Sequence, residues 1–202
     1  MPAPIEGSPL LPGHVPVDTQ QKNAGFFLVS QPPTDTRIGS ADMITYHEET
    51  DLFDLPADGF CHGINTVGAV GGLAESVFRR FPDLKHLYDR MVDAGHIAGG
   101  DMIPASYDYG DQRFTIYNLV TQVDSGADAR LPLVWKTLMQ MKVHAKENEV
   151  KSINCPTIGC GIGGLDWLEV KSVIEQVFED EPDVTLQVVT RSTFDSGSVL
   201  TV

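Results

Sequence analysis

Two glycine-rich segments contain the residues of this chain that are best suited to hold an anion. In "NTVGAVGGLAES", Gly68, Gly71 and Gly72 precede a helix-like pattern that starts near Leu73; in "CPTIGCGIGGLDW", four glycines precede a second such pattern near Asp166. Glycine lets the backbone approach a ligand closely, and a helix N-terminus adds unpaired N–H donors and a favourable dipole. The segments therefore predict two loops that grip a diphosphate from both sides. A tight strand-to-helix connection is the alternative for each.

The spacing of these glycines argues against two common classes of nucleotide-binding protein. Neither segment matches G-x-x-x-x-G-K-[ST], the phosphate loop of nucleotide triphosphatases. Neither gives a clean G-x-G-x-x-G dinucleotide fingerprint with its downstream acid. Spacing alone predicts an α/β domain with an anionic ligand.

One histidine close to the first glycine segment is a candidate for proton transfer. His62 lies in the buried-strand pattern "GFCHGI", three residues before Asn65. Histidine titrates near neutral pH and can move a proton or attack phosphorus, whereas a neutral, hydrogen-bonded core histidine is the other interpretation. Asp124 and Asp128 either bring a carboxylate to the site or belong to a solvated loop. Three more histidines have the setting of surface residues: His86, His96 and His144. No His, Cys and acid grouping has metal-site spacing, so no metal or other cofactor is expected.

Composition limits the partners of the chain. The 202 residues are 42% hydrophobic, enough for one domain with extensions. A formal net charge of -14 opposes nucleic-acid binding by bulk electrostatics and binding to anionic membranes, but not a small phosphorylated ligand held by backbone N–H groups. Cys61, Cys155 and Cys160 form no C-x-x-C pair and read as reduced thiols. With no apolar run of about 18 residues and no signal-peptide pattern, a soluble, cytoplasmic protein is expected.

The hydrophobic pattern divides the chain into an arm, a domain and a tail. Residues 1–40 are rich in Pro and Gly and predict a flexible arm, residues 41–191 form the domain, and residues 192–202 form a tail. Within the domain, strands alternate with helices, which predicts an α/β fold with a mostly parallel sheet covered on both faces. Strand patterns start at 43, 59, 113, 151 and 183, and helix patterns cover 73–95 with a break at Pro82, 131–150 and 166–180.

Longer motifs connect these segments to a known family. "TYHEETDLF", "HGINTVGAVGG", "FRRFP" and above all "PTIGCGIGGLDW" resemble motifs of the macrodomains, the ADP-ribose-binding α/β/α domains, over the region from about Met43 to Arg191. The resemblance is to the branch that contains terminal ADP-ribose protein glycohydrolases and DNA ADP-ribosyl glycohydrolases. It implies a three-layer α/β/α macrodomain with a mostly parallel central sheet, and ADP-ribose or an ADP-ribosylated substrate as the partner.

The resemblance also implies roles for individual residues. Asp51 matches the acid that accepts a hydrogen bond from the adenine amino group, although a solvated loop acid is the alternative. Asn65 matches the asparagine beside the distal ribose, with a turn residue that bonds its own backbone as the alternative. Gln122 follows the middle strand and is expected near the ligand. The matched loop residues are Gly68, Ala69, Val70, Gly71, Gly72 and Leu73 in the first loop, and Thr157, Gly159, Cys160, Gly161, Ile162 and Gly163 in the second.

Two catalytic positions of that branch differ in this chain. Gln122 stands where the branch has a lysine that acts at the anomeric carbon, and an amide cannot form a Schiff base. Gly163 stands where the protein-directed subgroup has an acid. His62 matches a histidine with a catalytic role in a phosphatase branch, so we expect His62 and Asn65 to catalyse hydrolysis with the ribose already oriented.

These matches predict hydrolysis of an ADP-ribose derivative at its distal ribose: a 1″-phosphate, an acyl-ADP-ribose or an ADP-ribosyl ester. A non-catalytic reader of ADP-ribose is the alternative. In a third, weaker hypothesis the pocket is vestigial and the N-terminal arm mediates protein contacts.

Overall fold

A computed structural model describes residues 43–48, 50–109 and 112–190. The predicted N-terminal arm, 1–40, and C-terminal tail, 192–202, lie outside the described residues.

The described strands form one six-stranded sheet in the order β1-β6-β5-β2-β4-β3. Each neighbouring pair is parallel except β3 and β4, which are antiparallel. The prediction of a mostly parallel sheet is therefore confirmed. The strands are β1 (Ile44–Glu48), β2 (Gly59–Ile64), β3 (Met102–Tyr109), β4 (Gln112–Val120), β5 (Ser152–Pro156) and β6 (Thr185–Thr190).

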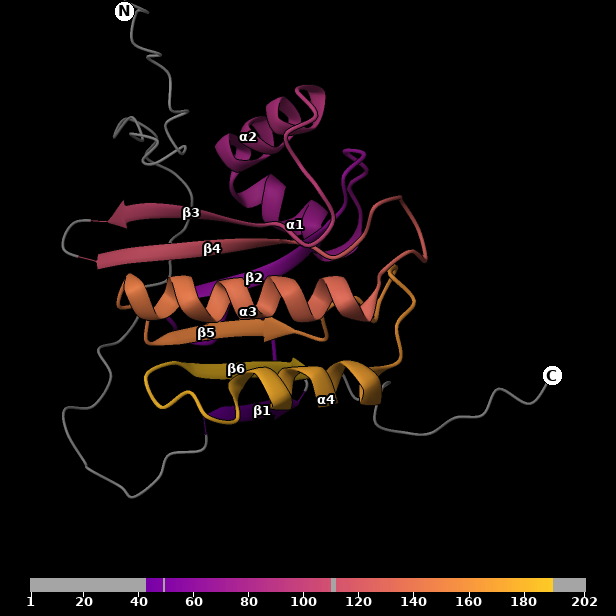
Figure 1. The fold of residues 1–202 in the computed structure, drawn as a ribbon. Helices are drawn as coiled ribbons and strands as arrows, with labels where there is room; N and C mark the ends of the chain where they lie inside the picture. The colour runs from indigo at the N-terminus through magenta and orange to yellow at the C-terminus, as the bar shows by residue number, and fades with distance from the viewer. Residues whose placement is uncertain (1–42, 49, 110–111, 191–202) are drawn as a thin grey trace, which may run out of the picture.

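Four helices cover the two faces of this sheet (Figure 1). Pro82 occupies the first turn of the second helix, so the predicted break in the helix pattern is confirmed; proline fits there because its missing N–H would be unpaired anyway. The helices are α1 (Gly72–Arg80), α2 (Pro82–Asp93), α3 (Leu131–Glu147) and α4 (Trp167–Phe178).

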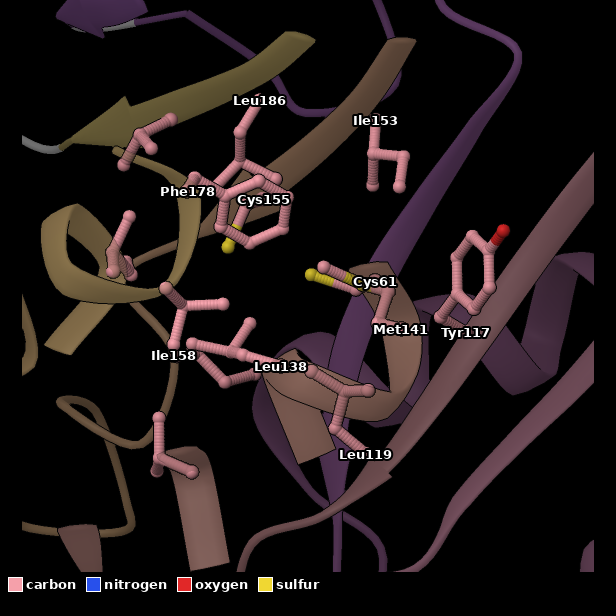
Figure 2. Close-up of a cluster of buried hydrophobic side chains, with 14 of the residues drawn as sticks. Cys61, Tyr117, Leu119, Leu138, Met141, Ile153, Cys155, Ile158, Phe178 and Leu186 are labelled. Atoms are coloured by element: carbon pink, nitrogen blue, oxygen red, sulfur yellow. The ribbon is translucent and has the colours of Figure 1, made fainter. Parts of the chain in front are cut away.

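Alternating side chains of the central strands feed two separate cores. On β2, Phe60 packs with residues of α1 and α2, whereas Cys61 packs with residues of α3 and α4, because successive strand residues point to opposite faces. Figure 2 shows the α3/α4 side, where Leu138 and Met141 of α3 lie near Cys61. Two cores on opposite faces make the fold a three-layer α/β/α sandwich, as predicted.

Sequence patterns do not predict β3. Pro104 and Asp108 are residue types that are unfavourable in strands, so the segment does not look like a strand in the sequence. In the structure, alternate residues of β3 pack against the α1/α2 core: Ile103, Ala105 and Tyr107. Proline is tolerated because β3 lies at the edge of the described sheet, where not every N–H is needed for pairing.

Among the residues that the structure describes, no helix combines the length and the apolarity required to cross a membrane.

Candidate functional site

Three loops meet at one end of the sheet, at the right in Figure 1. We name them the first loop (65–72, after β2), the middle loop (121–130, after β4) and the second loop (157–166, after β5). Because β2, β4 and β5 are parallel, their carboxyl ends share one edge, which is where open α/β sheets bind ligands.

Asn65 organises the first loop from within. Its Oδ1 accepts hydrogen bonds from Val67 N and Ala69 N, both at 3.1 Å, and its Nδ2 donates to Ala69 O at 2.7 Å. The buried Tyr88 hydroxyl of α2 donates to the Asn65 carbonyl at 2.8 Å. An amide nitrogen carries two hydrogens, so Asn65 keeps one donor beyond its bonds to the loop.

The first loop leaves the N-terminus of α1 open. Gly71 is the N-cap of α1 and has no side chain to close it. The N–H groups of Val70, Gly71 and Gly72 have no hydrogen-bond partner among the described residues. Orphan N–H groups at a helix start, together with the helix dipole, attract anions.

The second loop combines closed turns with a tip that offers further donors. Leu165 N donates to Gly159 O at 3.0 Å, and Asp166 caps α4 by accepting from Leu168 N and Glu169 N. The helix end of α4 is thus occupied by its own carboxylate. The donors without a partner within the described ranges include three at the tip: Gly161 N, Ile162 N and Gly163 N.

Ile162 brings the two glycine loops together. Its Cδ1 lies 3.1 Å from the position that a β-carbon would take on Gly71, and 3.3 Å from that on Gly72. Yet the Ile162 side chain is 59% exposed. Among the described residues, half of the exposed large apolar side chains lie on the three loops: Val67, Val70, Val123 and Ile162. Exposed apolar side chains on loops that also have unpartnered backbone N–H groups are typical of a ligand site.

The middle loop is held by hydrogen bonds of its own side chains. Gln122 Nε2 donates to Gly126 O at 2.7 Å, and Asp128 Oδ2 accepts from Val123 N and Asp124 N at 2.9 and 2.8 Å. These N–H donors, first that of Asp124, and then the Arg130 guanidinium lower the pKa of Asp128 to about 2. Asp128 is therefore a structural carboxylate in an exposed loop, which was one of its two predicted settings.

The middle loop also contacts both glycine loops. Thr66 Oγ1 of the first loop donates to Val123 O at 2.5 Å, and Ala129 N donates to Gly163 O of the second loop at 3.1 Å. No sequence motif singles out Thr66 or Ala129, since neither is chemically conspicuous and their partners come from other loops.

Gly163 has no room for a side chain. A β-carbon built there would lie 2.6 Å from Gly159 O and 2.7 Å from Ala129 Cβ, well inside contact distance. The acid that a branch of the resembled family carries near this position could be restored only if the loops moved.

His62 is buried beneath the site and points into the α1/α2 core. It has no exposed surface, and its ring packs edge-on against Phe78 of α1. Asn118 Nδ2 donates to Ile103 O, so Asn118 Oδ1 faces His62 and accepts from its Nε2 at 2.8 Å. Burial lowers the pKa of His62 to about 4, so the ring is neutral at pH 7.

The remaining candidates lie away from the three loops or have low chemical reactivity. Asp51 is exposed in the turn after β1, where its Oδ1 accepts from Phe53 N at 3.0 Å. Cys160 is 7% exposed, and burial raises the pKa of its thiol to about 12. His144 is half-buried rather than fully exposed, and its Nδ1 lies 3.3 Å from Tyr117 Oη. Across the part of the chain that the structure describes, no group of three or more His, Cys, Asp or Glu residues could hold a metal ion.

The model of the Macro domain family matches residues 62–174, and the chain belongs to this family. A DNA ADP-ribosyl glycohydrolase of Mycobacterium tuberculosis is 29% identical over 143 residues, which are 70% of this chain and 40% of that relative. The human ADP-ribose glycohydrolase OARD1 is 31% identical over 138 residues, 67% of this chain and 84% of the relative.

Among solved structures, the macrodomain of M. tuberculosis DarG superposes with a TM-score of 0.68 at 28% identity, covering 73% of this chain and 97% of that one. The chain thus spans less than half of the DNA ADP-ribosyl glycohydrolase but nearly all of the DarG macrodomain.

Proposed function

We propose that this macrodomain binds ADP-ribose and hydrolyses a bond at the distal ribose of an ADP-ribose derivative. One observation carries the proposal: the first and second loops both have backbone N–H groups without a partner among the described residues, and Ile162 brings the two loops together at Gly71 and Gly72. Neutral N–H donors bind a diphosphate locally even in an acidic protein.

The order of the strands supports one orientation of the ligand. The turn with Asp51 follows β1, and beyond it along the sheet edge come the second loop after β5, the first loop after β2 and the middle loop after β4. From β1 to β4 the edge measures four strand spacings, about 19 Å. Adenine near Asp51 and the diphosphate between the glycine loops leave the distal ribose beside the middle loop.

The relatives support hydrolysis as the reaction class, since their names identify them as ADP-ribosyl and ADP-ribose glycohydrolases. The resemblance sets Gln122 where the branch has its lysine, and an amide cannot form a Schiff base, so we propose a route that does not use lysine. We propose that water cleaves the bond between the distal ribose and its phosphoryl or acyl group: the water oxygen ends on that group, and a water proton ends on the ribose oxygen that is released. Asn65 and the first loop hold the ribose in a reactive orientation, with the free Nδ2 hydrogen of Asn65 on a ribose hydroxyl.

The proposed part of His62 is less direct than the matched phosphatase branch implies. A ring with no exposed surface and a depressed pKa is poorly placed to receive a proton from water. Its contact with Phe78 and its hydrogen bond to Asn118 support a positioning role beneath the first loop.

A reader of ADP-ribose without turnover is the second candidate. It is favoured by the two positions that differ from the catalytic residues of the resembled branch. The Gln122 amide donates its hydrogens within the middle loop, and Ala129 leaves no room for a side chain at Gly163. Both candidates use the same binding contacts, so turnover alone separates them.

A phosphorus NMR time course with ADP-ribose 1″-phosphate, run beside a proton NMR time course with an acyl-ADP-ribose ester, tests the proposal. Shifted diphosphate lines report binding, and growing inorganic phosphate or free acid reports hydrolysis. Turnover of either substrate supports the hydrolase. Shifted lines without turnover of either favour the reader, and unshifted lines at millimolar ligand would overturn both.

A further inference from the structure

The middle loop is built to be rigid although it is exposed. Gln122 reaches across it to Gly126 O, and more weakly to Asp124 O at 3.4 Å. Asp128 closes the opposite side through Val123 N and Asp124 N, and the bridge between Gln122 and Ala129 draws the two ends together. Gly126 adopts φ +78° at the tip, which glycine accepts without strain. The loop therefore has its shape before any ligand arrives.

The same loop ties the two glycine loops to each other. Thr66 Oγ1 anchors the first loop to Val123 O. Ala129 anchors the second loop through its N–H to Gly163 O, and Ala127 Cβ lies 3.0 Å from the β-carbon position of Gly164. A change in the shape of the middle loop would therefore alter the wall beyond the diphosphate as well as the spacing of the glycine loops.

We infer that Gln122 is a positioning residue that holds the middle loop as the wall around the distal ribose, so that recognition of the ribose depends on it more than recognition of the diphosphate. The inference rests on the proposed function, which sets adenine at Asp51 and the distal ribose at the carboxyl end of β4. ADP ends at its second phosphate and would not reach the middle loop. ADP-ribose would contact it.

Isothermal titration calorimetry with ADP and with ADP-ribose tests the inference. Gln122→Ala removes the brace, and we expect its Kd for ADP-ribose to rise about tenfold, the loss of roughly one well-placed hydrogen-bonded contact. Its Kd for ADP should stay within about twofold, because the diphosphate contacts come from backbone N–H groups of other loops. Gln176→Ala is the control, since it also removes a glutamine hydrogen bond, to Ser172 Oγ, but Gln176 lies near the C-terminal end of α4, outside the three loops.

A second pair of variants tests the wall without touching Gln122. Thr66→Val keeps the shape of the side chain but cannot donate to Val123 O, and should weaken ADP-ribose about threefold with little effect on ADP. Thr66→Ser keeps the hydroxyl and should restore the wild-type ratio of the two Kd values. A merely structural role would lower the thermal midpoint without changing that ratio.

The outcomes separate two failures. If the wild-type protein binds neither ADP nor ADP-ribose, the proposed function is wrong and the inference falls with it. If the wild type binds both but Gln122→Ala weakens them equally, or weakens neither, the proposed function stands and the inference alone is overturned.

Discussion

The two halves of the candidate site differ in whether backbone atoms or side chains form them. The half that we assign to the diphosphate consists of backbone: N–H groups of the first and second loops, brought together at Gly71 and Gly72. The half that we assign to the distal ribose depends on side chains, chiefly Gln122 and Asp128 in the middle loop. Backbone N–H donors remain when side chains are substituted, whereas a contact made by a side chain is lost with one substitution. On the proposed function, this difference would explain how a macrodomain keeps its affinity for ADP-ribose when side chains near the distal ribose differ from those of the resembled glycohydrolase branch.

The largest effect is expected where charge enters the backbone half. Gly71 has extended backbone, φ -168°, so other residues fit its conformation. Gly71→Glu would set a carboxylate against the diphosphate, and we expect affinity for ADP-ribose to fall about a thousandfold, or about 4 kcal/mol. Gly71→Ala is the matched control, because Ile162 Cδ1 need yield only slightly from 3.1 Å. Equal titration curves for the two variants would break the assignment of this half to the diphosphate.

A second prediction asks whether His62 belongs to the chemistry or to the scaffold. Its pKa is about 4 in the fold and 6.5 ordinarily, so between these values the unfolded chain binds a proton that the folded chain does not. Stability from this group is present above pH 6.5 and is lost as the pH falls toward 4, by about 3 kcal/mol in total. His62→Gln can still donate to Asn118 Oδ1 but does not titrate, so its unfolding free energy in urea should fall less from pH 7 to pH 4.5.

His144→Gln is the comparison variant. Burial also lowers the pKa of His144, but this ring is only half-buried, so its substitution should change the pH dependence of the unfolding free energy less than His62→Gln does. The same slope in the wild type and His62→Gln would contradict the scaffold role. Loss of turnover with unchanged ADP-ribose binding in His62→Gln would instead support the catalytic prediction made from the sequence.

The backbone half could be predicted from the sequence only in part, and the side-chain half could not: the first loop leaves its helix start open as expected, whereas Asp166 caps the helix start after the second loop. Glycine spacing before a helix start is a local pattern, and it correctly marks the open N-terminus of α1 at Gly71 and Gly72. The strand and helix alternation likewise gave the layers, except for β3, where Pro104 interrupts an edge strand. Local patterns suffice where the backbone itself provides the function.

Two kinds of contact could not be predicted: contacts within the middle loop, which depend on the shape of its turns, and contacts between loops, whose partners are distant in the chain. The role of Gln122 depends on a carbonyl that only the turn at Gly126 presents. The crowding at Gly163 comes from Gly159 O of the same loop and from Ala129 of the middle loop. The sequence shows that both positions depart from the resembled branch, but not what the replaced residues do.

A third prediction concerns the point where the two halves touch. Gly163→Ala would force its β-carbon to within 2.6 Å of Gly159 O, and we expect a loss of about 2 kcal/mol in unfolding free energy from this overpacking. Gly161→Ala is the matched control, because a β-carbon there meets nothing within 4 Å and neither glycine has a positive φ. Chemical denaturation of both variants makes the comparison, and equal stabilities would show that the loops yield easily.

The smallest effect is expected from introducing the lysine of the resembled glycohydrolase branch. Gln122→Lys brings an ammonium group with donors that can reach Gly126 O, so the middle loop should keep its shape and ADP-ribose its affinity within about threefold. Turnover of an ADP-ribosyl ester should not rise, because a lysine held in the loop does not point at the ribose and because Gly163 leaves no space for a companion acid. A liquid-chromatography assay of released ADP-ribose, with Gln176→Lys as control, measures this. A rise in turnover of tenfold or more would contradict this prediction. It would mean that one substitution gives the middle loop lysine-dependent chemistry, and that the loop is mobile enough to bring the lysine to the ribose.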